Sequence, residues 1–175
     1  MPSFDPRSPR ALWEAFAPDV FRLLHRTLGP EQPVDDAAQD VFLRVFDAAP
    51  QGADCAALRP IILSAVARVV CERLRWRKLR RRPRGATSSS LVSLYRILGR
   101  LRARDQVAFA FHFIDGLDVR EVAAALGESS ARIDRRLVRA WDSVAARVSR
   151  DTYLTQVGHF LRADRAGGAF VEPPN

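Results

Sequence analysis

Apolar residues return every three or four positions along most of the chain, and no stretch alternates between apolar and polar residues as a half-buried strand does. This pattern predicts an all-α protein. Ser8 followed by Pro9 is typical of a helix start. Pro18 is expected to interrupt this first helix and to begin another, which ends at Gly29 and Pro30.

Two more helices are predicted in the first half of the chain. Asp35 and Asp36 complement the positive end of a helix that Pro50 terminates. Its expected buried face consists of Ala38, Val41, Phe42, Val45 and Phe46. A long helix is then expected from about Ala56 to Arg82, with an apolar first half and a cationic second half. We therefore expect its first half in a core, while its second half offers cations and an indole.

The composition changes after Pro83, where residues 84–90 are small and polar, as in a flexible connector. Beyond it, apolar residues resume helical spacing at Leu91. We therefore predict two small helical domains, 1–83 and 91–149, joined by a short flexible linker at 84–90. Residues 150–175 form a C-terminal extension, with one short amphipathic helix expected to pack against the second domain.

The second domain is predicted to contain a helix-turn-helix. Asp118 and Glu121 have the spacing of a capping box, and Gly127 suits the tight turn before a second helix. Ser129 or Ser130 can cap that helix, whose exposed side carries Arg132, Arg135, Arg136 and Arg139. In such motifs the second helix enters the major groove of DNA. The alternative is a helical hairpin with an ordinary charged face.

The charge is concentrated in one segment. The chain has 28 Lys plus Arg against 20 Asp plus Glu, and Lys78 is the only lysine. Residues 68–84 hold nine of the basic residues and one acid, while the remainder of the chain holds 19 of each sign. Arginine suits forked contacts with phosphates and base edges, so this segment favours a polyanionic partner. The alternatives are a solvated linker and a patch for a bacterial membrane surface.

Several functional classes are disfavoured. Cys55 and Cys71 match no zinc or redox spacing, and the three histidines lack partners at ligand spacing. No catalytic triad order or glycine-rich phosphate loop is present. No apolar run has the length of a membrane span or a signal peptide. We therefore expect a soluble cytoplasmic protein that is not an enzyme, inserts into no membrane, and holds neither a cofactor nor a metal.

In the first domain, the segment from Val34 to Phe46 resembles region 2 of the extracytoplasmic-function (ECF) sigma factors, which belong to the bacterial sigma-70 family. The resemblance implies that this segment grips the clamp helices of core RNA polymerase through Asp35, Asp36, Gln39, Asp40, Phe42 and Leu43. The helix from Leu58 to Arg82 is similar to the part of region 2 that captures and opens the minus-10 element. That similarity implies DNA contacts by Arg68, Arg73, Arg75, Trp76, Arg77, Lys78, Arg80 and Arg81.

In the second domain, the stretches Leu98–Leu101, Gly116–Ala123 and Leu126–Gly127 resemble region 4, whose helix-turn-helix reads the minus-35 element. The resemblance implies that Ser130, Arg132, Arg135, Arg136 and Arg139 contact that element. A protein of this kind directs core RNA polymerase to promoter DNA and carries out no bond chemistry. Many members of the family are also held inactive by an anti-sigma factor, which is therefore a third candidate partner. The resemblance covers about residues 10–148.

Two departures from the family pattern keep a second function open. Pro60 and Ile61 stand where a tryptophan is usual at the start of the promoter-melting helix. Asp134 stands where the recognition helix commonly has a cation, and it can accept from a cytosine amino group or pair with a neighbouring arginine. The alternative function is that of a diverged sigma-like protein, or a free-standing helix-turn-helix regulator, which does not open promoters.

Overall fold

The computed structural model describes residues 8–29, 32–50, 53–79 and 90–150. Throughout these residues the regular elements are helices, which confirms the all-α prediction. They are α1 (Pro9–Leu28), α2 (Asp35–Ala48), α3 (Cys55–Leu79), α4 (Ser90–Leu98), α5 (Ala103–Phe109), η1 (Ala110–Ile114), α6 (Val119–Leu126) and α7 (Ser130–Val148). The predicted linker at 84–90 and the C-terminal extension lie almost wholly outside the described residues.

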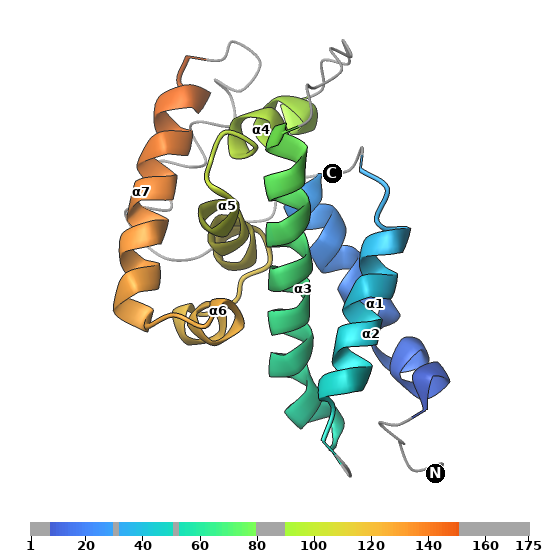
Figure 1. The fold of residues 1–175 in the computed structure, drawn as a ribbon. Helices are drawn as coiled ribbons and strands as arrows, with labels where there is room; N and C mark the ends of the chain where they lie inside the picture. Colours follow the sequence, from blue (N-terminus) through green and yellow to red (C-terminus); the bar gives the residue numbers. More distant parts are fainter. Residues whose placement is uncertain (1–7, 30–31, 51–52, 80–89, 151–175) are drawn as a thin grey trace, which may run out of the picture.

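Helix α3 forms the centre of the molecule, with α1 and α2 on one side and α5 and α6 on the other (Figure 1). Helix α7 packs on the outer side of α5 and α6 and also contacts α4. One continuous cluster of buried residues runs from α1, α2 and α3 into α5, α6 and α7. The helices of both predicted domains therefore share a core, and the domain boundaries remain a prediction from the sequence.

The sequence of α3 explains its central position. Between Ile62 and Leu74 nearly every side chain is buried or half-buried, and Arg68 is the one exposed residue of that stretch. Ile62, Ala65 and Val69 share one side of the helix, whereas Leu63, Ala67 and Val70 share another. A helix that is apolar nearly all round is stable only between two other layers.

Helix α1 begins where the sequence predicts, because Ser8 accepts a hydrogen bond from the Ala11 amide. The predicted interruption at Pro18 is wrong, since α1 continues through it to Leu28. Pro18 lies on the exposed side of the helix. A proline has no amide hydrogen to donate to the carbonyl one turn earlier, and on this side water can bond that carbonyl instead. The apolar stripe of Leu12, Val20 and Leu24 continues unbroken on the buried side.

The helix-turn-helix of α6 and α7 is confirmed, and its local chemistry matches the prediction. Asp118 accepts from the Glu121 amide at 2.8 Å, and Glu121 accepts from the Asp118 amide at 3.1 Å, so both bonds of a capping box are present. Gly127 ends α6 with φ at +64°, a conformation that favours glycine. Ser129 occupies the capping position of α7, although its side chain caps no amide.

Candidate nucleic-acid interface

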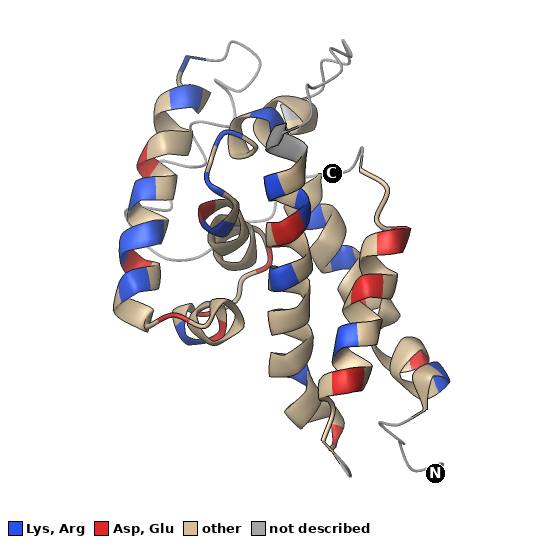
Figure 2. Cartoon of the chain, viewed as in Figure 1, with Lys and Arg blue, Asp and Glu red and all other residues tan. Residues whose placement is uncertain are grey.

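The exposed side of α7 carries most of the residues predicted to contact the minus-35 element. Ser130, Arg132, Arg135 and Arg139 are all exposed. Figure 2 shows basic positions repeated along the length of α7. Within the described part of the chain, no carboxylate pairs with Arg135 or Arg139, so both guanidinium groups are available to a polyanion. Asp134 is exposed beside them.

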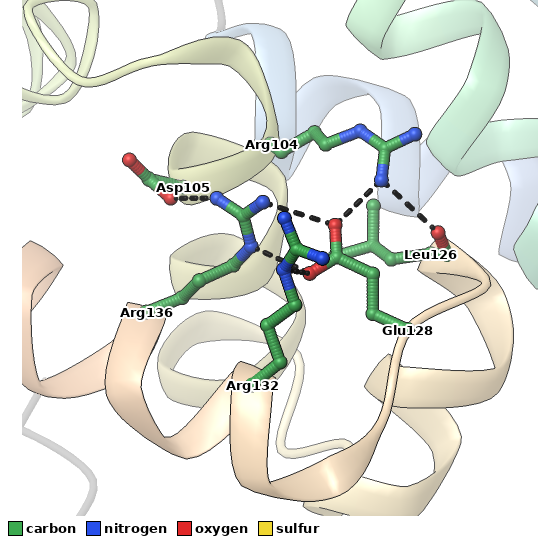
Figure 3. Close-up of polar contacts among 6 residues, drawn as sticks. All are labelled: Arg104, Asp105, Leu126, Glu128, Arg132 and Arg136. Atoms are coloured by element: carbon green, nitrogen blue, oxygen red, sulfur yellow. Dashed lines mark hydrogen bonds and ion pairs between the residues drawn. The ribbon is translucent and has the colours of Figure 1, made fainter.

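Arg136 differs from its neighbours, because its side chain is only 12% exposed and points back into the motif. Its Nη1 donates to Asp105 Oδ1 of α5 at 2.5 Å. Its Nε and Nη2 donate to the two carboxylate oxygens of Glu128 at 2.8 and 3.0 Å. Arg136 therefore ties α7 to α5 and to the turn between α6 and α7 (Figure 3).

Glu128 is the centre of this network, which we call the turn network: Arg104, Asp105, Glu128, Arg132 and Arg136. The Glu128 side chain is 4% exposed and also faces Arg104 Nη1 at 2.5 Å and Arg132 Nε at 3.2 Å. Bonds from Arg136 lower the pKa of Glu128 from 4.5 to about 2, against the opposing effect of its burial. The carboxylate therefore stays ionised and, through Arg104 and Arg136, connects α5 with α7.

The predicted minus-10 residues are only partly free. Arg68 and Arg75 are exposed, although Arg68 Nε lies 3.6 Å from Glu72 Oε1, and Trp76 is 69% exposed. Arg73 instead donates to Asp40 of α2 at 2.9 Å. Arg77 and Lys78 belong to α3, but their side chains are outside the described set, and Arg80 and Arg81 lie outside the described residues altogether.

The residues predicted to bind polymerase lie on α2, which is predominantly acidic (Figure 2). Asp35, Asp36, Gln39 and Leu43 are exposed, and Phe42 is half-buried. Asp40 is exposed but paired with Arg73. This ion pair between α2 and α3 links a residue predicted to bind polymerase to one predicted to bind DNA. Nearby, Arg44 forms a bidentate ion pair with Glu72, in which Nη1 donates to Oε1 at 3.2 Å and Nη2 donates to Oε2 at 2.8 Å.

Two aromatic residues extend this surface, and the sequence prediction missed both. Phe46, predicted in the core, is instead 43% exposed, and Trp13 of α1 is 45% exposed. The Trp13 ring lies 4.8 Å from that of Phe42. Together with Leu43, which is 58% exposed, these residues form an apolar patch across α1 and α2. We call Trp13, Phe42, Leu43 and Phe46 the α2 patch.

Helical periodicity could not have revealed the α2 patch. Trp13 and Phe46 occupy positions compatible with a buried stripe, and spacing does not say which apolar side is covered. An exposed cluster of large apolar side chains is typical of a protein-binding surface. The α2 patch therefore suits a protein partner, whereas the basic side of α7, in a separate part of the molecule, suits a polyanion.

The described residues contain no group of three or more His, Cys, Asp or Glu side chains placed to hold a metal ion. None of their helices has the length and apolar character needed to cross a membrane.

Comparison with known families identifies both halves of the chain. The family model for sigma-70 region 2 matches residues 12–60, and the model for sigma-70 region 4 matches residues 91–141. No curated protein matches the chain. The first match contains the whole α2 patch and ends early in α3, so the basic part of α3 lies beyond it. The second contains α4 from Leu91 onward, all of α5 and α6, and the exposed arginines of α7.

Proposed function

Because the chain belongs to the sigma-70 family and carries region 2 and region 4 in that order, we propose that it is an ECF-type sigma factor that brings core RNA polymerase to promoters. Membership of this family makes it a transcription factor of promoter recognition rather than an enzyme. The α2 patch and the exposed side of α7 are the surfaces that bind polymerase and promoter DNA. The protein acts in the cytoplasm with polymerase, and an anti-sigma factor is a further partner.

The observation that carries the proposal is that each matched region has its own exposed surface. The α2 patch in region 2 is apolar and edged by Asp35, Asp36 and Gln39, which suits a protein partner. The exposed side of α7 in region 4 is basic, which suits DNA. A free repressor has no need of the first surface.

In the upstream contact, α7 enters the major groove with its N-terminal part toward the bases. The guanidinium groups of Arg135 and Arg139 form bidentate hydrogen bonds with guanine or phosphate, and Ser130 offers a hydroxyl at the start of the helix. Asp134 is placed to accept from a cytosine amino group. Arg136 and Arg132 face Glu128, so we assign Arg136 to positioning the helix rather than to contacting a base.

In the downstream contact, the exposed residues Arg68, Arg75 and Trp76 of α3 face the minus-10 region. The indole supplies a face on which an unpaired base can stack, and the arginines neutralise the backbone. Such binding favours separated strands because it stabilises unstacked bases. The protein itself makes or breaks no covalent bond.

The second candidate is a sigma-like regulator that binds polymerase but does not open promoters. The observation that favours it is the burial of most of α3, which leaves a narrow exposed side with Arg68 and Arg75. Permanganate footprinting of thymines in a polymerase–promoter complex separates the two functions, because only the first candidate unpairs them.

The first experiment is co-elution of the purified protein with bacterial core RNA polymerase, which requires no knowledge of the promoter. Leu43→Arg places a charge in the α2 patch, and we expect it to abolish co-elution. The matched control is Leu91→Arg, since Leu91 is 60% exposed on α4, outside the patch. Failure of the unaltered protein to co-elute, or equal loss in both variants, refutes the proposed function.

A further inference from the structure

Helices α2 and α3 are joined by paired side chains of alternating charge. On α2, Asp40 and Arg44 lie one turn apart, and on α3, Glu72 and Arg73 are neighbours. Arg73 Nη2 donates to Asp40 Oδ2 at 2.9 Å. The two Nη atoms of Arg44 donate to the two carboxylate oxygens of Glu72. Each helix therefore contributes one carboxylate and one guanidinium group to these contacts, which we call the crossed pairs: Asp40–Arg73 and Arg44–Glu72.

The first pair turns Arg73 away from solvent. Arg68, Glu72 and Arg75 recur at helical spacing along one side of α3, whereas Arg73 is turned toward α2. The Arg73 side chain is 34% exposed, and its Nε is buried with no hydrogen-bond partner among the described residues. A buried N–H without a partner costs free energy. The pair with Asp40 therefore holds Arg73 in a position that its own Nε disfavours.

The second pair leaves Arg68 available. Arg68 Nε lies 3.6 Å from Glu72 Oε1, which is too long for a direct hydrogen bond, and the Arg68 side chain is 76% exposed. Hydrogen bonds from Arg44 are the main cause that lowers the pKa of Glu72, and Arg68 contributes less. If Arg44 were removed, Arg68 would be the one described cation still paired with Glu72.

The second pair also removes a repulsion. Glu72 is 43% exposed on the same side of α3 as Arg68 and Arg75. An unpaired carboxylate at this position would repel a phosphate backbone. The guanidinium group of Arg44 offsets that charge from the neighbouring helix. Helix α2 thus sets the charge on the exposed side of α3.

We infer that Asp40 and Arg44 of α2 are positioning residues that decide which arginines of α3 reach a nucleic-acid strand. Asp40 withholds Arg73, whereas Arg44 leaves Arg68 free for a phosphate. The inference rests on the proposed function, because it divides the arginines predicted to contact the minus-10 element. Arg68 and Arg75 contact the strand, and Arg73 does not.

The availability of each arginine can be measured without a partner. Phenylglyoxal modifies free guanidinium groups, and mass spectrometry of proteolytic peptides gives the rate at each position of the full chain. In the unaltered protein, Arg73 should react more slowly than Arg68 and Arg75. Asp40→Ala should raise the rate at Arg73 about two- to fivefold, the population ratio that an exposed ion pair of ordinary strength maintains. Arg44→Gln should lower the rate at Arg68.

Nucleic-acid binding gives a second readout, in which the two substitutions act in opposite directions. A labelled single-stranded oligonucleotide of random sequence is titrated by fluorescence anisotropy between about 50 and 200 mM salt. Asp40→Ala should steepen the slope of log affinity against log salt by about 0.7, the value of one phosphate contact to a single strand, and Arg44→Gln should flatten it by about the same amount. Adding Glu72→Gln to Arg44→Gln should restore the slope, because an amide does not attract Arg68.

Two matched controls separate the crossed pairs from net charge. Asp47→Ala and Arg10→Gln change the net charge by the same amounts at exposed positions outside the crossed pairs. Both should leave the slope and the rates at Arg68 and Arg73 unchanged. Partial unfolding would weaken binding in every variant, so it cannot produce changes of opposite sign.

The inference and the proposed function fail separately in these measurements. Equal reactivity of Arg73 and Arg75 in the unaltered protein, or slope changes of the same sign in Asp40→Ala and Arg44→Gln, overturns the inference. If the reactivities are as expected but Arg68→Ala and Arg75→Ala leave oligonucleotide binding unchanged, the proposed minus-10 surface is wrong, while α2 still sets the availability of the arginines.

Discussion

Replacing Glu128 by glutamine tests the turn network most directly. Glutamine keeps the size of the side chain and one carbonyl oxygen, but it removes the charge that faces Arg104, Arg132 and Arg136. Arg136 then keeps Asp105 as its remaining acidic partner. The expected result is a less stable protein whose recognition helix is held less firmly.

The magnitude follows from the pKa of Glu128. It falls from 4.5 to about 2 in the folded protein, a drop of roughly 2.5 pH units, and one unit corresponds to about 1.36 kcal/mol. The ionised carboxylate therefore contributes up to about 3 kcal/mol to the free energy of unfolding. Its 4% exposure means that solvent screens little of this interaction. We expect Glu128→Gln to cost about 2–3 kcal/mol at pH 7.

The pH dependence has a definite sign. Because the pKa is lower in the folded protein, the stabilisation is fully present above about pH 4.5 and is lost as the pH falls toward 2. A protonated Glu128 resembles glutamine, so the difference between the two proteins should vanish at the acid end of this range.

Urea denaturation followed by circular dichroism at pH 7, 4 and 2.5 measures this difference. The control is Asp142→Asn, which removes a carboxylate from the same helix away from the turn network, and it should change stability by less than about 0.5 kcal/mol. A loss below about 1 kcal/mol for Glu128→Gln at pH 7 would mean that the turn network contributes little to stability, contrary to this prediction. A loss that stays constant down to pH 2.5 would also contradict it.

Three further predictions concern other parts of the molecule. Arg135→Ala or Arg139→Ala should weaken binding of an upstream promoter duplex by about 1–3 kcal/mol in fluorescence anisotropy and leave stability unchanged, whereas Arg136→Ala should lower the free energy of unfolding by about 3 kcal/mol. Trp13→Ala should weaken binding to core polymerase by about 2 kcal/mol in a titration, and Trp76→Ala should spare that affinity while weakening single-strand binding. Burial raises the pKa of Asp115 from 3.8 to about 6, against the opposing effects of Arg26 and Arg22. Because the folded protein holds this proton more tightly than the unfolded chain does, the free energy of unfolding should fall as the pH rises from about 4 to 6. Urea denaturation at a series of pH values should show that Asp115→Asn removes up to about 3 kcal/mol of this fall.

Local chemistry made the helix-turn-helix predictable. A capping box needs Asp118 and Glu121 three residues apart, and a left-handed turn needs a residue such as Gly127, so both can be identified from a few adjacent positions. The start of α1 at Ser8 is predictable for the same reason. Its continuation through Pro18 is not, because the buried stripe on the opposite side of the helix outweighs the missing bond.

The partners of individual side chains could not be predicted. Arg135 and Arg136 are neighbours on one helix, yet only Arg136 reaches Asp105, 31 residues away in the sequence. Likewise, periodicity shows that α3 has two apolar sides but not that α5 and α6 cover the second. The α2 patch is unpredictable in the same way, because the exposure of Trp13 and Phe46 depends on elements that do not pack there.

The core that the two halves of the chain share has a consequence for synthesis on the ribosome. At the end of α1, the buried Thr27 carbonyl accepts a hydrogen bond from Gln106 Nε2, 79 residues further along the chain. Contacts of such long sequence separation form late and slow folding, because the intervening loop must close first. The first half of the chain therefore emerges with an unfinished helix end and an uncovered apolar side on α3. Until α5 and α6 have left the exit tunnel, that uncovered apolar surface is prone to associate with other chains.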